Sequence, residues 1–93
     1  MRVIAGRAGG IRLMSPKNGV RPTMDRVKAA IFSSLGELLI DARVLDLFAG
    51  TGALGIEALS RGANSALFIE ADRQSILAVE KNLHKTKLAG RVR

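Results

Sequence analysis

Hydrophobic residues recur along this chain in two patterns that predict helices and strands in turn. Between residues 24 and 39 they return at intervals of three and four, which predicts a helix with Thr23 as its N-cap and an end near residues 36–40. Residues 44–48 form a continuous apolar run interrupted only by Asp46, which is typical of a strand buried on both faces. Residues 66–69 predict a second strand of the same kind.

A helix pattern follows each of these strands. Residues 53–61 predict a short helix that ends at Gly62, and Asp72 can cap a third helix that Gly90 would end. Residues 91–93 then resemble the start of another strand. Strands that alternate with helices imply a parallel sheet, so we expect an α/β, Rossmann-like fold that binds its ligand at the carboxyl ends of the strands.

The N-terminal segment has a different character. Two partly alternating stretches, residues 2–5 and 11–14, flank a glycine-rich stretch and predict a β-hairpin, followed by a loop over residues 15–20. We therefore divide the chain into a basic hairpin and loop, residues 1–20, and an α/β part, residues 21–93.

Charge gathers in that first segment. Of the 15 Lys and Arg residues seven lie within residues 1–28, against one of the 8 acids, so most of the net charge of +7 is there. Phosphate backbones are the partner that such a patch favours, with an ordinary solvated basic surface as the equal alternative.

Composition narrows the function classes. Only 3% of the residues are aromatic, so stacking platforms for unpaired bases are nearly absent. The absence of cysteine excludes disulfides and thiolate metal sites, and the lone His84 cannot build a metal site. No apolar run reaches the roughly 18 residues of a membrane helix, and no signal peptide is evident, so we expect no membrane partner and a cytoplasmic protein.

The loop after the first strand carries the most specific chemistry. Gly50, Gly52 and Gly55 satisfy the dinucleotide fingerprint, with Glu70 about 20 residues on, so a nicotinamide-binding domain is a rival interpretation. Asp46 argues against it, because a carboxylate beside the loop would repel a pyrophosphate. S-adenosylmethionine fits better, since it carries an ammonium, a sulfonium and ribose hydroxyls but no phosphate.

Blander interpretations of these residues stay open. Asp46 could be a structural acid that accepts backbone N–H groups from the loop, and Glu70 a solvated acid at a strand end. The three glycines could form a tight turn and nothing more.

The stretch VLDLFAGTGALGIEALSRGA at residues 44–63 resembles motif I of the bacterial 16S ribosomal RNA guanine-N2 methyltransferases, which are class I S-adenosylmethionine-dependent enzymes. The similarity extends to MRVIAG at residues 1–6, RPTMDRVK at residues 21–28 and FIEADR at residues 68–73. The resemblance implies methyl transfer to the exocyclic N2 of a guanine, with 16S rRNA or the small ribosomal subunit as partner.

By position, the resemblance also implies which residues form each site. The cofactor-binding residues would be Asp46, Phe48, Ala49, Gly50, Thr51, Gly52, Glu70 and Ala71, with Pro22, Thr23 and Arg26 bordering the pocket. The residues that hold RNA phosphates would be Arg2, Arg7, Arg12, Lys17 and Arg21.

The chain departs from the family at the catalytic motif, Asn or Asp followed by Pro-Pro and an aromatic residue. Its only prolines are Pro16 and Pro22, so we assign no catalytic residue and expect the N-terminal half of such an enzyme, inactive by itself. The short sheet would leave an apolar edge through which copies of the chain could associate. A non-catalytic half-domain that binds RNA or cofactor is the main alternative, and a nicotinamide-binding domain is the less favoured one.

Overall fold

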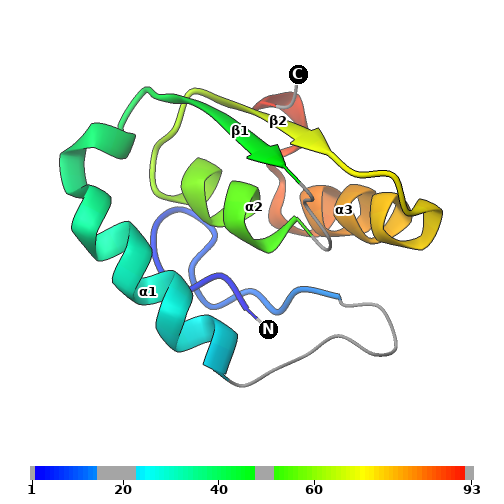
Figure 1. Cartoon of the computed structure of the whole chain (residues 1–93), viewed down its shortest axis with the longest axis horizontal. Coiled ribbons are helices and arrows are strands. Elements are labelled where there is room, and N and C mark those ends of the chain that lie inside the picture. The colour runs from blue at the N-terminus through cyan, green and yellow to red at the C-terminus, as the bar shows by residue number, and fades with distance from the viewer. Residues whose placement is uncertain (1, 15–22, 48–51, 92–93) are drawn as a thin grey trace.

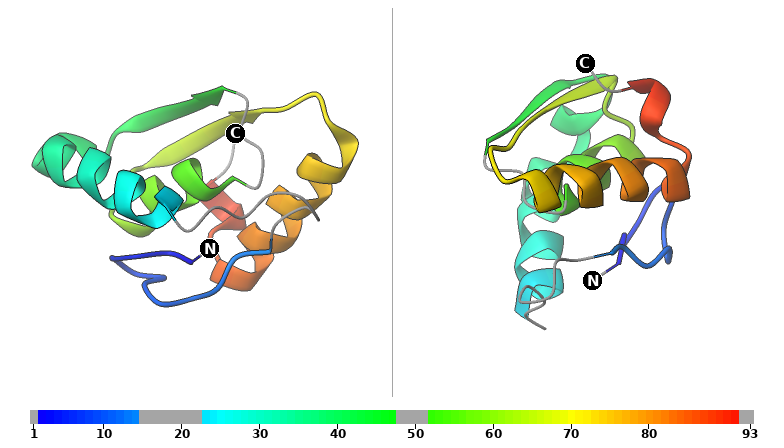
Figure 2. Two further views of the ribbon diagram at one scale, coloured as in Figure 1. Left: turned by 60° about the horizontal axis from the view of Figure 1, so that its bottom comes forward. Right: turned by 90° about the vertical axis from the view of Figure 1, so that its right-hand side faces the viewer.

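The structure of the protein, a computed structural model, describes residues 2–14, 23–47 and 52–91. It has three layers: a small parallel sheet, the helices on one face of that sheet, and an N-terminal arm on the far side of the helices (Figures 1 and 2). The expected roles of Lys17, Arg21, Pro22 and residues 48–51 fall outside the described residues.

The predicted order of elements is confirmed, with most boundaries shifted by one or two residues. The chain runs through α1 (Thr23–Leu35), the 3-10 turn η1 (Gly36–Leu39), β1 (Arg43–Leu47), α2 (Ala53–Ser60), β2 (Ser65–Ile69), α3 (Arg73–Thr86) and η2 (Ala89–Arg91). Thr23 is the first helical residue of α1 rather than its cap. Among the described residues, no helix combines the length and apolarity needed to cross a bilayer.

Successive side chains along each strand point to opposite faces of the sheet. Strands β1 and β2 pair in parallel, with Asp46 opposite Phe68. Asp46 and Ala66 are buried on the side where Figure 1 shows α2 and α3. The buried core between these layers includes Ile56, Ala58, Leu59, Ala66, Val79, Leu83 and Leu88.

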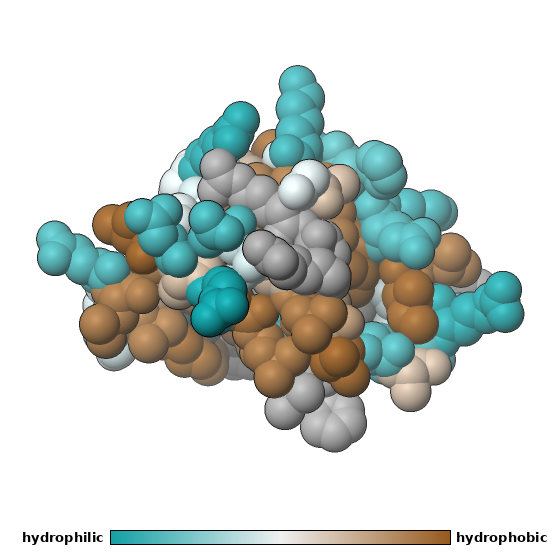
Figure 3. All heavy atoms as spheres, turned by 90° about the horizontal axis from the view of Figure 1, so that it is seen from above, coloured by the Kyte–Doolittle hydropathy of each residue, from teal (hydrophilic) through white to brown (hydrophobic). Residues whose placement is uncertain are grey.

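The opposite face of the sheet is apolar and open. Leu45, Leu67 and Ile69 are 58%, 41% and 46% exposed there. Figure 3 looks onto the molecule from the sheet side and shows hydrophobic residues gathered at several places between hydrophilic ones. Self-association through the sheet stays a prediction, which light scattering at several concentrations would test.

The ends of the helices follow local rules. Gly62, at φ +115°, ends α2 as predicted, since Gly62 N–H donates to Leu59 O at 3.2 Å and Ala63 N–H to Ala58 O at 3.0 Å. The predicted Asp72 cap is also confirmed, because its Oδ2 accepts from the N–H of Ser75 at 3.0 Å.

The C-terminal predictions were wrong. Helix α3 ends at Thr86 rather than at Gly90, because Lys87 takes a left-handed conformation and turns Leu88, which is 1% exposed, into the core. Of the strand start predicted over residues 91–93, Arg91 instead closes the 3-10 turn η2, and residues 92–93 fall outside the described residues.

The predicted hairpin is present in reduced form. Its arms join at one isolated antiparallel bridge, Arg2 with Arg12, and Val3 N–H donates to Ile11 O at 2.9 Å. No regular ladder forms along residues 2–14, because the N–H groups of Ile4 and Ala5 turn to a side chain of α2. We call residues 2–14 the N-terminal arm.

Candidate cofactor and nucleic-acid site

The predicted cofactor residues that the structure describes gather at the carboxyl ends of the two strands. Asp46 lies near the end of β1, Gly52 directly precedes α2, and Glu70 directly follows β2. Gly52 has φ +82°, and its carbonyl accepts from Ile56 N–H at 2.8 Å, so this glycine turns the chain into the helix.

Asp46 is buried, with 7% of its surface exposed. Its Oδ2 accepts a hydrogen bond from Gly55 N–H at 3.1 Å, in the first turn of α2. Burial raises the pKa of Asp46 above its ordinary value of 3.8; the Gly55 N–H opposes that rise, and the charge of Glu70 adds to it. Asp46 therefore has the structural role weighed as an alternative, and it also lies within electrostatic reach of Glu70.

A hollow gives access to this carboxylate. Its volume is about 210 Å³ and its lining, apart from Asp46, is apolar, with Ile31, Leu35, Leu54 and Gly55 among the lining residues. A ligand group in this hollow would meet Asp46 as its polar partner.

Two glycines at the start of α2 lie in close packing. A Cβ added at Gly55 would lie 2.3 Å from Phe68 Cε1 and 3.2 Å from Asp46 Oδ2, so the Phe68 ring would have to move if α2 were to keep its approach to the sheet. A Cβ at Gly52 would lie 3.2 Å from side-chain atoms of Ile56 and Val79. Both glycines thus serve the fold as well as the candidate site.

Glu70 is half-buried, and its Oε2 accepts from Asp72 N–H at 3.0 Å. This contact holds the carboxylate at the end of β2, next to the exposed Ala71. Two carboxylates at the carboxyl ends of the paired strands make a site suited to ammonium and hydroxyl groups and unfavourable to phosphates, so the residues present fit S-adenosylmethionine. Thr23 and Arg26 of α1 were expected to border the cofactor pocket. In the structure Thr23 is the first residue of the helix, and the Arg26 side chain is exposed.

The structure places three of the predicted RNA-binding residues on the surface. Arg2, Arg7 and Arg12 are exposed on the N-terminal arm. Lys28 is different: it counted toward the basic excess of the first 28 residues, but it is 2% exposed. Its Nζ donates to Arg2 O at 2.7 Å and lies 3.5 Å from Glu57 Oε1. The surface charge of the segment is therefore smaller than the sequence indicated.

Sequence reasoning missed Glu57, which is 0% exposed on α2. Its Oε1 accepts from Ile4 N–H at 2.8 Å, and its Oε2 accepts from Ala5 N–H at 3.1 Å and from Arg61 Nε at 2.7 Å. One signal was present, because Glu57 is the only charged residue in the otherwise apolar and small-residue segment of α2. Arg61 lies four positions on, a spacing that the sequence shows, but the arm residues Ile4 and Ala5 lie more than 50 positions away, so the sequence could not name them.

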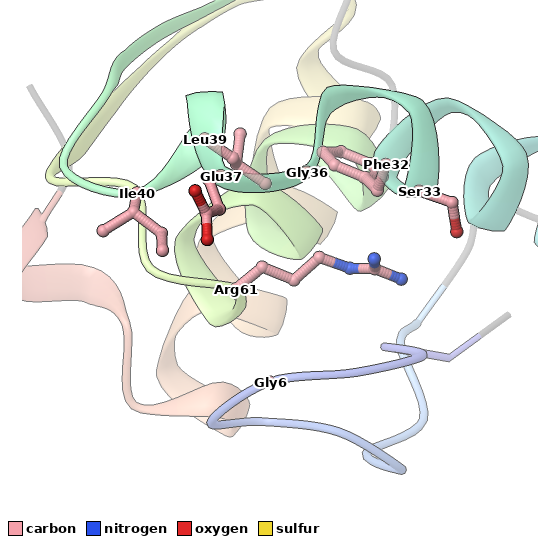
Figure 4. Close-up of a pocket in the computed structure, with 8 residues that line it drawn as sticks. All are labelled: Gly6, Phe32, Ser33, Gly36, Glu37, Leu39, Ile40 and Arg61. Atoms are coloured by element: carbon pink, nitrogen blue, oxygen red, sulfur yellow. The ribbon is translucent and has the colours of Figure 1, made fainter.

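A second hollow lies at the other end of α2, between that helix, α1 and the N-terminal arm (Figure 4). The Arg61 guanidinium sits 5.2 Å from the centre of the Phe32 ring. The volume is about 430 Å³, and the lining residues are Gly6, Phe32, Ser33, Gly36, Glu37, Leu39, Ile40 and Arg61.

Comparison with known proteins gives the family. The family described as Conserved hypothetical protein 95 matches residues 1–93. The chain belongs to this family. It is 47% identical over 94 residues to Ribosomal RNA small subunit methyltransferase D of Escherichia coli (strain K12), covering 100% of this chain and 47% of that protein.

Two further relatives agree with this membership. Putative rRNA methyltransferase YlbH of Bacillus subtilis (strain 168) is 45% identical over 89 residues, or 95% of this chain and 48% of that protein. The solved structure of the putative methyltransferase yhhF from Escherichia coli superposes with a TM-score of 0.89 at 43% identity, covering 100% of this chain and 50% of that one. The chain thus spans about half the length of the relatives it matches, and the predicted Rossmann-like α/β fold of class I methyltransferases is confirmed.

Proposed function

We propose that this chain supplies the S-adenosylmethionine-binding part of an enzyme that methylates the N2 of a guanine in 16S rRNA. The observation that carries the proposal is the pair of carboxylates, Asp46 and Glu70, at the carboxyl ends of β1 and β2, in a chain similar throughout its length to a small-subunit rRNA methyltransferase. A pyrophosphate-bearing cofactor would meet two like charges there.

Each described residue has a distinct part in this proposal. Glu70 would accept hydrogen bonds from the ribose hydroxyls, and Asp46 would accept from cationic or hydrogen-bond-donating groups of the cofactor. The glycine at position 52 lets the backbone come close to the ligand. The bound cofactor would supply an electrophilic methyl group on its sulfonium.

The N-terminal arm is proposed to bind RNA phosphates. Arg2, Arg7 and Arg12 are exposed there, and their guanidinium groups suit phosphate oxygens because they present several donors in one plane. Phosphate contacts position a protein on nucleic acid without reading its sequence, so this part of the proposal names a partner class and no target nucleotide.

The chain itself is expected to transfer no methyl group. It contains no Pro-Pro sequence, and the Asn/Asp-Pro-Pro-aromatic motif that the resemblance implies would orient the guanine amine is not among its 93 residues. Methyl transfer to 16S rRNA by the purified 93-residue chain would contradict this expectation.

A calorimetric titration tests the cofactor. S-adenosylhomocysteine should bind the chain and NADH should not, and Asp46→Asn should abolish the binding. Asp41→Asn is the matched control, since Asp41 is an exposed acid whose left-handed backbone Asn also tolerates. Binding of NADH, with no binding of S-adenosylhomocysteine, would establish the nicotinamide alternative instead.

A further inference from the structure

Helix α2 connects the candidate cofactor site to the N-terminal arm. It begins at the Gly52 turn, where Gly55 N–H bonds Asp46, and its second half carries Glu57 and Ser60, which hold the arm. We propose that Glu57 and Ser60 are positioning residues that set the place of the basic arm, and hence of bound RNA, relative to the cofactor. This inference rests on the proposed function of the arm, and we call the two residues the arm clamp.

Glu57 provides the charged half of the arm clamp. The N–H groups of Ile4 and Ala5 both donate to its carboxylate, and a buried carboxylate forms stronger hydrogen bonds than a neutral acceptor does. Lys28 and Arg61 lie against the same carboxylate at 3.5 and 2.7 Å, so its charge is compensated inside the protein. The arm backbone is thereby fixed to α2 just before the turn that carries Arg7.

Ser60 provides the neutral half and encloses that turn. Its Oγ accepts from Ala8 N–H at 2.8 Å and donates to Ala5 O at 2.7 Å, while its own carbonyl accepts from Arg7 N–H at 2.7 Å. A Cβ at Gly6 would lie 2.1 Å from Ser60 O, so the arm lies directly against the end of the helix. The backbone on both sides of Arg7 is held by one serine.

The geometry makes α2 a fixed spacer between the two ends. Its eight residues span about 12 Å, and two hydrogen-bonded turns of helix leave little room for bending. A shift of the arm relative to Asp46 therefore requires that the contacts of the arm clamp loosen. Asn82 of α3 adds a separate tether at the far end of the arm, bonding Met14 N–H at 2.6 Å and Met14 O at 2.9 Å.

A double-mutant cycle distinguishes positioning from general stability. The single and double variants of Ser60→Ala and Arg7→Ala are titrated with a transcribed 16S rRNA fragment. In the parent chain we expect Arg7→Ala to weaken binding about fivefold, as for the loss of one phosphate contact. Ser60→Ala removes the Oγ bonds to Ala8 and Ala5 on either side of Arg7 and keeps the bond from Arg7 N–H to the carbonyl of residue 60. In this background we expect the same change to cost less than about twofold, because the loosened turn positions the Arg7 side chain less well.

The matched control is Ser75→Ala, which removes a buried serine hydroxyl that bonds Asp72 on α3, away from the arm. In that background Arg7→Ala should keep its full effect. S-adenosylhomocysteine affinity should be unchanged in Ser60→Ala, and amide exchange should rise over residues 3–10 but not over residues 73–86.

Three results would count against the inference. Equal effects of Arg7→Ala in all backgrounds, or faster exchange throughout the Ser60→Ala chain, would overturn it and leave the proposed function intact. Absence of RNA binding by the parent chain would overturn the proposed role of the arm itself.

Discussion

The two ends of α2 are built in different ways. At its start, two glycines allow close packing, and one buried acid, Asp46, bonds the first turn while its pKa is raised by burial. At its end, the buried Glu57 is surrounded by two backbone N–H groups and two cations. Under the proposed function, the first end keeps a carboxylate that a donor-bearing ligand would stabilise, whereas the second end supplies its donors from within the chain. A buried acidic residue can thus belong either to a candidate binding site or to an internal clamp, and the number of hydrogen-bond donors that the chain places around it distinguishes the two.

The largest expected effect is a loss of stability at the clamp end of α2, by which we mean the end that carries Glu57 and Ser60. Glu57→Gln leaves the buried Lys28 and the partly exposed Arg61 against a neutral amide, and loss of one partner of a buried ion pair costs about 3–5 kcal/mol of stability. Thermal and urea unfolding measure the change in the free energy of unfolding. Glu80→Gln on the exposed surface of α3 is the control and should leave that free energy nearly unchanged. Equal stability of the two variants would show that the clamp does not hold the arm.

The next largest loss of stability is expected from replacing Gly6 of the N-terminal arm. Gly6→Ala forces a left-handed alanine against Ser60 O, which should cost about 3 kcal/mol of stability. Gly10→Ala is the matched control, because Gly10 has φ +88° but nothing within 4 Å of its added Cβ. It should cost only the backbone strain, about 1–2 kcal/mol. Unfolding curves that coincide for the two variants would contradict the close approach of arm and helix.

At the cofactor end the corresponding change is Gly55→Ala. The added Cβ would meet the Phe68 ring at 2.3 Å, and a side chain gives way more easily than a backbone carbonyl, so we expect a cost of about 1–3 kcal/mol. Because Gly55 N–H bonds Asp46, the shift should also weaken S-adenosylhomocysteine binding, which Gly6→Ala should leave intact. Calorimetry on both variants measures this contrast, and an equal loss of ligand affinity in the two would contradict it.

The smallest effect is a pH dependence confined to the cofactor end. Burial raises the pKa of Asp46 above 3.8, so its carboxylate protonates at less acidic pH than an ordinary aspartate does. Below the raised pKa, S-adenosylhomocysteine affinity should fall by about tenfold per pH unit. The effect on stability has the opposite sign: an acid with a raised pKa favours the folded state below pH 3.8, and this contribution is lost as the pH rises through the raised value.

Calorimetry over a pH series measures the affinity, with Asp46→Asn as the reference. That variant should show no measurable S-adenosylhomocysteine binding at any pH of the series. An affinity that does not change until ordinary aspartates titrate would contradict the raised pKa.

Sequence reasoning predicted the elements, and the gathering of the candidate cofactor residues at one edge of the sheet, because both depend on nearby residues. The glycines, Asp46 and Glu70 lie within 25 positions of one another, and strand order brings them to one edge of the sheet. At the other end of α2, Glu57 and Arg61 follow the i,i+4 spacing of a helix, but no spacing rule connects Glu57 to residues 4, 5 and 28. The end of α3 was missed for a related reason, since the burial of Leu88 favours a left-handed Lys87 over a stop at Gly90.

The central claim is that the start of α2 binds the cofactor and that its end holds the RNA-binding arm. An NMR titration of the ¹⁵N-labelled chain tests this claim most directly. S-adenosylhomocysteine should shift the amide signals of Gly52, Gly55 and Glu70 and leave those of Ile4, Ala5 and Ala8 in place, while a 16S rRNA fragment should shift the arm. NADH should shift neither group. Shifts of the arm amides by S-adenosylhomocysteine, with the α2 start unmoved, would contradict the account.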